Sequence, residues 1–188
     1  MITFGSIYKS SASVNKISKN KELIPHNVAF VEMKPDSMYD NLTLNIVANI
    51  LPKRKKFART MWENFVMTYK GKSKDAKVKY FAITKEQPNY KFVKPNNVLG
   101  MVEVSFYPLT GNAVFVNYIQ VLKNFIFNKF DHVGTSIIDS IKKLYPDKDI
   151  ILNAIPSTVP FYEKNGFFKE ENQSYERSVK MRYSPKKN

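Results

Sequence analysis

Apolar positions in the first half of the chain alternate in one segment and recur at helical spacing in the next two. Residues 27–34 (NVAFVEMK) alternate and end before a proline, which predicts a half-buried strand. A helix follows that Asp36 or Ser37 can cap and that stops before Pro52. A second amphipathic helix runs up to Gly71. The apolar residues expected to face a core on these helices are Leu42, Ile46, Val47, Ile50, Phe57, Met61, Trp62, Phe65, Val66 and Tyr69.

The second half of the chain predicts mostly strands, with one helix that begins at Gly134 and a short helix that ends at Gly166. Glycine suits the left-handed conformation that often follows the last turn of a helix. The predicted elements are strands at 78–84, 98–106 and 113–121, a helix from 134 through Leu144, a strand at 150–155, a helix at 158–164, and strands at 167–170 and 178–183. The order β-α-α-β-β-β-α-β-α-β-β favours an α/β fold class with a mixed α+β sheet over a doubly wound sheet or a sandwich.

Composition predicts one globular domain. The chain has 188 residues, of which 43% are hydrophobic, enough for one sizeable core. We expect the domain at residues 27–183, after a flexible or loosely docked tail over 1–26 and before a basic tail at 184–188. No apolar run is long enough to cross a bilayer, so we expect a cytoplasmic protein, as a monomer or homodimer. The absence of cysteine excludes disulfides and a cysteine nucleophile.

The formal net charge of +14 raises the question of an anionic partner. Clustered Lys and Arg side chains bind nucleic acid by releasing counterions from its phosphates. One dense basic patch is present, formed by Lys53, Arg54, Lys55, Lys56 and Arg59. It fits either a solvated helix start or a nucleic-acid contact.

The last third of the chain resembles the Gcn5-related N-acetyltransferase superfamily. Its segments VNYIQV (116–121), HVGTSIIDSIKKLYP (132–146), IILNAI (150–155) and FYEKNGF (161–167) carry the resemblance, and FYEKNGF is the most specific. The predicted element order also matches the arrangement of that family. The resemblance implies the family's fold over roughly residues 27–183, acetyl-CoA as the co-substrate, and transfer of an acetyl group to an amine.

The resemblance also implies a site for acetyl-CoA on two backbone segments. A strand that stops pairing leaves amides free, and an extended pantetheine arm can dock there as a surrogate strand. Free N–H groups at a helix start suit a pyrophosphate. The candidates are Ile119, Gln120 and Val121 for the arm, and Val133, Gly134, Thr135 and Ser136 for the phosphates.

The loop before this helix departs from the family's pattern of Gln or Arg, two residues, Gly, one residue, and Gly or Ala. This chain has KFDHVG at 129–134. Lys129 replaces the Gln or Arg, and His132 replaces the first glycine, so a left-handed backbone at His132 would be strained. Asp131 adds a negative charge near the expected phosphates, which Lys129 or a protonated His132 can offset.

Direct transfer needs a proton acceptor, because only about one lysine-like amine in two thousand is neutral at pH 7. The family often places a glutamate on a central strand, but residues 114–119 (VFVNYI) contain none, so Glu103 on the preceding strand is the candidate base instead. Glu32 is a second candidate, and Asn117 or Tyr118 can orient a water. Tyr162 lies in FYEKNGF where the family keeps its general acid, so it is the candidate that protonates the departing thiolate.

Several alternatives stay open at this stage. The acceptor is a small amine or a protein amino group, or an aminoacyl-tRNA that the basic patch would bind, as toxin members of the family do. A further alternative is a non-catalytic binding module whose altered loop no longer holds CoA. The two histidines, His26 and His132, show no metal-ligand spacing, so no metal is expected.

Overall fold

The computed structural model describes residues 5–50, 56–69, 77–86, 93–107, 112–122, 130–175 and 178–185. These residues form a nine-stranded sheet of order β6-β1-β2-β3-β4-β5-β7-β9-β8, flanked by helices. The strands are β1 (Ile7–Ile17), β2 (Leu23–Met33), β3 (Lys77–Thr84), β4 (Val98–Phe106), β5 (Ala113–Val121), β6 (Phe130–Asp131), β7 (Asp149–Ala154), β8 (Phe168–Tyr175) and β9 (Ser178–Tyr183). The helices are α1 (Met38–Ile50), α2 (Lys56–Tyr69), α3 (Val133–Leu144) and α4 (Val159–Lys164), with short 3-10 turns at Pro95–Asn97 and Pro156–Thr158.

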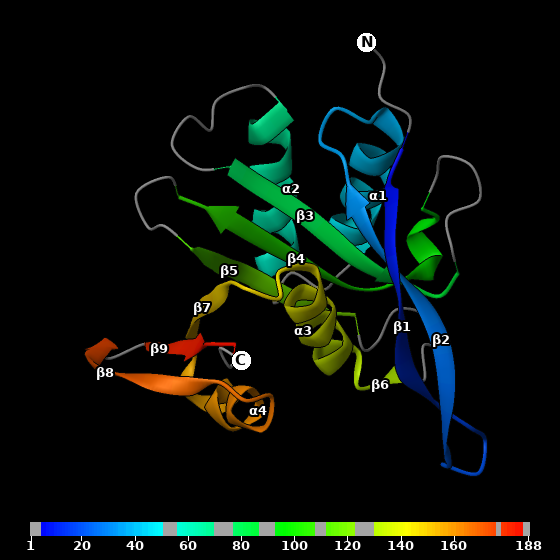
Figure 1. The fold of residues 1–188 in the computed structure, drawn as a ribbon. Helices are drawn as coiled ribbons and strands as arrows, with labels where there is room; N and C mark the ends of the chain where they lie inside the picture. Colours follow the sequence, from blue (N-terminus) through cyan, green and yellow to red (C-terminus); the bar gives the residue numbers. More distant parts are fainter. Residues whose placement is uncertain are drawn as a thin grey trace.

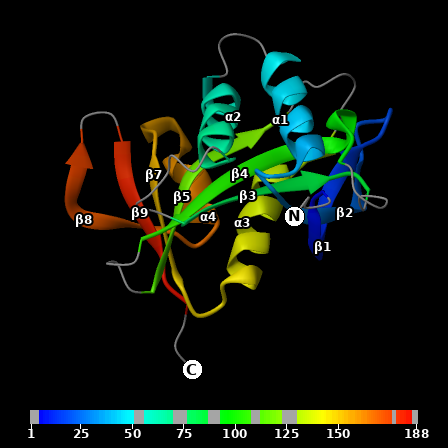
Figure 2. The same cartoon turned by 90° about the horizontal axis from the view of Figure 1, so that it is seen from above.

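Helices cover both faces of the sheet, so two apolar cores form. α1 and α2 lie on one face, and α3 and α4 lie on the other (Figure 1, Figure 2). The first core includes Leu44, Val47, Met61 and Phe65 from α1 and α2, and the second includes Ile137 and Ile141 from α3. Among the described helices, none is both long enough and apolar enough to cross a membrane.

The predicted fold class and the predicted helices and strands are confirmed in the described residues. Ser37 caps α1, because its Oγ accepts the N–H of Asp40 at 3.2 Å. Gly166 adopts φ 76°, the left-handed conformation expected after α4. The prediction for Leu42 is wrong: its side chain is 49% exposed, and Leu44 fills the core position at 2%. The side chains of Ile50, Phe57 and Tyr69 lie outside the described residues.

The N-terminal residues differ from the tail predicted over residues 1–26. Residues 7–17 form β1, which pairs antiparallel with β2 from Ile7↔Glu32 to Ile17↔Leu23, and β2 itself begins at Leu23. Val14 is 1% exposed in the α3-side core. The prediction is therefore wrong for residues 7–17 and 23–26. Val14 is the one buried residue of β1, so the strand shows no alternating buried face, and backbone pairing with β2 holds it in the sheet.

The sheet opens between β5 and β7. These two strands are parallel and pair only from Ala113↔Asp149 to Val116↔Leu152. β5 continues to Val121, hydrogen-bonded to β4 on its other side. Asn117 is the extra residue of a bulge, since Val104 pairs with Val116 and Glu103 with Tyr118. From Asn117 onward, the β7-facing edge of β5 has no strand partner in the described residues.

Candidate active site

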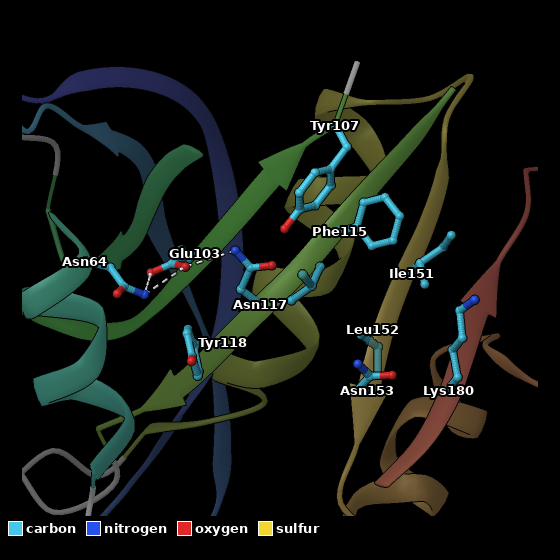
Figure 3. Close-up of a pocket in the computed structure, with 11 residues that line it drawn as sticks. Asn64, Glu103, Tyr107, Phe115, Asn117, Tyr118, Ile151, Leu152, Asn153 and Lys180 are labelled. Carbon is cyan, nitrogen blue, oxygen red and sulfur yellow. Dashed lines mark hydrogen bonds between the residues drawn. The ribbon is translucent and has the colours of Figure 1, made fainter. Parts of the chain in front are cut away.

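Three adjoining cavities cross the sheet where β5 and β7 separate. The α2-side cavity, about 500 Å³, is lined by Glu103, Tyr107 and Lys180 among others, and Figure 3 shows its walls. It shares Val116, Asn117, Tyr118, Leu152 and Asn153 with the central cavity of about 130 Å³. The central cavity shares Ile119, Thr158 and Tyr162 with the α3-side cavity of about 500 Å³. Together they form a groove from α2 on one face to the start of α3 on the other.

Glu103 is a buried carboxylate in the wall of the α2-side cavity. It lies on β4, is 2% exposed, and points toward α2. Its carboxylate accepts hydrogen bonds from Nδ2 of Asn64 at 3.1 Å and from Nδ2 of Asn117 at 2.9 Å (Figure 3). Burial raises the pKa of Glu103, and the two amide donors oppose this shift only in part. Because both donors are neutral, Glu103 holds a proton more readily than an exposed glutamate does.

Tyr162 lies where the central and α3-side cavities meet. Its ring packs edge-on against Phe161 and Phe167, with centroid distances of 5.0 and 5.8 Å. The carbonyl of Tyr162 accepts the N–H of Phe167 at 3.0 Å, so the turn at Gly166 fixes the end of α4. Burial raises the pKa of the Tyr162 phenol, which keeps its proton at neutral pH.

The start of α3 forms the wall of the α3-side cavity. His132, Val133, Gly134 and Thr135 all line it. His132 adopts φ 61°, so the left-handed conformation considered from the sequence is present without a glycine. The N–H of His132 donates to Oδ1 of Asp131 at 2.8 Å. The first-turn amides of α3 have no acceptor within the helix, as at any helix start.

Ser136 is turned away from this cavity. Its amide donates to the carbonyl of His132 at 2.9 Å, and its hydroxyl donates to the carbonyl of Ser13. Both hydrogen-bond donors of Ser136 are therefore already used within the protein. They are not available for the phosphate contact predicted from the sequence.

The predicted residues of β5 divide between two environments. Ile119 and Val121 line the α3-side cavity, whereas Gln120 lines none of the three. The side chain of Gln120 donates to the carbonyl of Val121 at 2.9 Å.

Lys129 lies outside the described residues, as does most of the basic patch: Lys53, Arg54 and Lys55 entirely, and the side chains of Lys56 and Arg59.

Glu32 lies away from the groove. It is buried at 5% exposure and forms ion pairs with Lys9 at 2.6 Å, Lys34 at 2.8 Å and Lys79 at 3.8 Å. Burial by itself would raise the pKa of Glu32, but hydrogen bonds from Lys34 and Lys9 lower it overall. Glu32 lines none of the three cavities, so the structure does not bring this second candidate base into the site.

The α2-side cavity is also lined by Asn64, Asn153 and Lys180, which were not predicted from the sequence. Lys180 is also ion-paired with Glu170 at 2.7 Å. These residues come from α2, β7 and β9, and no local motif marks them. Within the described part of the chain, no group of three or more His, Asp or Glu side chains is arranged to hold a metal ion.

Comparison with known proteins identifies the fold. No protein-family model and no curated protein sequence matches the chain. Ard1 from Thermoplasma volcanium is similar in structure, with a TM-score of 0.53 at 14% identity over 85% of this chain and 99% of that one. A putative acetyltransferase of the GNAT family from Desulfovibrio desulfuricans has a TM-score of 0.52 at 15% identity, covering 84% and 98%. The PaiA N-acetyltransferase from Thermoplasma acidophilum, in complex with coenzyme A, has a TM-score of 0.51 at 14% identity. The match covers 84% of this chain and 98% of that one. The chain therefore has the fold of the Gcn5-related N-acetyltransferases, as its sequence motifs predicted.

Proposed function

We propose that the protein is an acetyl-CoA-dependent N-acetyltransferase that moves an acetyl group directly to an amine in a ternary complex. The observation that carries this proposal is the groove through the opening between β5 and β7. Tyr162 lies along its α3 side and Glu103 along its α2 side. A donor and an acceptor entering from opposite faces would meet at the central cavity.

Two features of the chain suit acetyl-CoA on the α3 side. Beyond Asn117 the β7-facing edge of β5 pairs with no strand among the described residues, so it can take an extended pantetheine arm like an added strand. The first-turn amides of Val133, Gly134 and Thr135 border the same cavity and suit a pyrophosphate. In the complex of the PaiA enzyme, coenzyme A is bound by a protein of this fold. We infer that the α3-side cavity is the donor site.

The chemistry needs two protons taken from the nitrogen, because an ammonium becomes an amide, and one proton given to the sulfur. Acetyl-CoA supplies the acetyl group and a thiolate leaving group. Glu103 accepts the proton of the incoming ammonium, directly or through a water, so that the amine lone pair can attack the thioester carbon. Tyr162 donates its phenol proton to the sulfur as the carbon–sulfur bond breaks, and its raised pKa keeps that proton in place until then. The proton still left on the positively charged nitrogen passes to the Tyr162 phenolate, directly or through a water, so the products are an N-acetylated amine and free CoA, and Glu103 returns its proton to solvent.

Release of the CoA thiol from acetyl-CoA tests the activity with small amines, polyamines, and peptides with free N-termini or lysines as acceptors. Tyr162→Phe should lower turnover about 10²-fold, the low end of general-acid effects, with little change in acetyl-CoA affinity. Tyr39→Phe serves as the matched control, because Tyr39 is exposed at the start of α1 and lines none of the three cavities. Unchanged turnover in Tyr162→Phe would remove this residue from the mechanism.

Glu103→Gln tests the base. A base works only when deprotonated, so wild-type kcat/KM should rise with pH through the pKa of Glu103, which burial has raised. Glu103→Gln should lose that rise and about 10² in turnover. Exposed Glu22→Gln should leave the pH profile as in the wild type. If Glu103→Gln left the pH profile of kcat/KM unchanged, a group other than Glu103 would be the base that takes the proton from the amine.

Acetylation of aminoacyl-tRNA and a non-catalytic binding role remain as alternative outcomes of these assays. The hydrogen bond from His132 N–H to Asp131 favours the binding-module alternative, because a carboxylate holds an amide near the proposed phosphate site. Absence of CoA binding by calorimetry would support it. Steeply salt-dependent RNA binding, lost when Lys53 and Arg54 are replaced, would instead favour the tRNA alternative.

A further inference from the structure

Three consecutive residues of β1 contact the donor loop and the start of α3. The carbonyl of Ser13 accepts a hydrogen bond from the hydroxyl of Ser136. Val14 is buried in the same apolar core as Val133. Asn15 donates from Nδ2 to Nδ1 of His132 at 3.1 Å. β1 therefore touches the loop, the first turn of α3 and the core between them.

Backbone pairing reinforces these side-chain contacts. β6, the two-residue strand before His132, pairs antiparallel with β1 through Asn15↔Asp131 and Lys16↔Phe130. Asp131, held in this way, accepts the N–H of His132 at 2.8 Å. The loop is thus held by β1 up to the residue at which α3 begins.

The residue that most needs such support is His132. It stands at φ 61° and ψ 13°, where a side chain with a Cβ is disfavoured. A conformation of this kind persists only when its surroundings determine it. The hydrogen bond from Asn15 forms only when the imidazole ring points back toward β1, so it selects the backbone conformation that carries the chain into α3.

We propose that Asn15 is a positioning residue for the donor site: by holding His132 in the left-handed conformation, it orients the amides of Val133, Gly134 and Thr135 for the pyrophosphate of CoA. This inference rests on the proposed donor site. Asn15 itself does not line the α3-side cavity and acts through His132. The N-terminal strand is accordingly part of the donor site, although it contributes no ligand to it.

Calorimetry with CoA tests the proposal on the full chain. Asn15→Ala, and Asn15→Leu as a variant of similar size, should weaken CoA binding roughly threefold to tenfold, the range for one lost hydrogen bond. The kcat at saturating acetyl-CoA should stay within about twofold of the wild-type value, so the effect of the substitution should appear as a higher KM for acetyl-CoA. Asn27→Ala is the matched control, because Asn27 is exposed on β2 and pairs with Ser13 of β1. Equal CoA affinity in Asn15→Ala and Asn27→Ala would overturn the proposal.

A double-mutant cycle separates positioning from general destabilisation. In a His132→Gly background, where glycine adopts the left-handed conformation freely, Asn15→Ala should have no further effect on CoA affinity. An equal loss in both backgrounds would show that Asn15 acts through something other than His132, against the proposal.

Hydrogen exchange in the ligand-free protein makes the test independent of the donor. The amide of Ser136, which donates to the carbonyl of His132 at 2.9 Å, should exchange faster in Asn15→Ala than in Asn27→Ala. If the wild type fails to bind CoA, the proposed function fails while this measurement still decides the positioning role. Identical exchange in both variants would refute that role.

Discussion

At Gly134 the first turn of α3 lies so close to α4 that a side chain would displace an aromatic ring. A Cβ at this position would lie 3.0 Å from Cζ of Phe161 and 3.6 Å from Cγ2 of Val121. The ring of Phe161 lines the α3-side cavity and packs on Tyr162. A methyl group at position 134 therefore acts on the donor site through its neighbours.

We predict that Gly134→Ala weakens acetyl-CoA binding about tenfold while thermal stability changes little. The displaced ring narrows the cavity, whereas alanine favours the helix over glycine by up to about 1 kcal/mol and offsets the crowding. Calorimetry and thermal unfolding measure the two effects. Adding Phe161→Leu should restore affinity, and a double variant as weak as Gly134→Ala would contradict the steric explanation.

Asp131 places a negative charge beside the amides proposed to bind phosphate. Asp131→Asn keeps an oxygen for the N–H of His132 and removes only the charge. We predict threefold to tenfold tighter CoA binding at low salt, roughly the scale of a partly screened charge pair, and a smaller gain at 0.5 M salt. Asp139→Asn, the same change on the exposed face of α3, should leave CoA affinity near the wild-type value. Weaker binding in Asp131→Asn would mean that this carboxylate supports the loop more than it repels the ligand.

The first turn of helix α1 contains a buried carboxylate, Asp40, whose ionisation at neutral pH destabilises the folded protein. Its Oδ2 accepts the N–H of Lys34 at 2.8 Å, but its buried Oδ1 has no partner in the described residues. Burial, with a contribution from Asp36, raises the pKa of Asp40 to about 6. The folded protein therefore keeps this proton over a pH range in which the unfolded chain has lost it.

We predict that this group lowers the free energy of unfolding as pH rises from about 4 to about 6, because the unfolded state then binds fewer protons than the folded state. Asp40→Asn should remove that decrease, a difference of up to about 3 kcal/mol. Urea unfolding of both proteins between pH 4 and 7 measures it, with exposed Asp147→Asn as the control. If the free energy of unfolding changed with pH in parallel for the wild type and Asp40→Asn, Asp40 would have the same pKa in the folded and unfolded states, against the prediction.

The elements that sequence predicted best are those whose apolar spacing is strong. The helix containing Ile137 and Ile141 and the strands from 78 onward were found, because their packing faces repeat in sequence. Strand β1 was missed, since its place depends on the free edges of β2 and β6, which no local pattern records. Leu42 was assigned to the core in place of Leu44 because both lie on one helix and only tertiary packing distinguishes them.

For the molecule as a whole, sequence named some residues that line the groove, named Gln120 and Ser136, which do not, and missed others that the fold brings there from distant elements. Tyr162 was named because it lies in FYEKNGF, and Glu103 because the proposed reaction needs a base; both line the groove. The amide of Asn64 that holds Glu103 could not be found, because it reaches β4 from a helix 39 residues earlier in the chain. The cavities depend on where β5 and β7 part, and that point is set by the bulge at Asn117. No sequence spacing encodes it.

The attachment of β1 to the donor loop also has a consequence for how the protein folds. The contact between Asn15 and His132 spans 117 positions and that between Ser13 and Ser136 spans 123. Closing so long a stretch of chain is entropically costly and slow, so contacts of this kind form late. During synthesis, the loop can reach its final shape only after more than two thirds of the chain has left the ribosome. We therefore expect competence to bind CoA to appear among the last events of refolding, after most of the secondary structure.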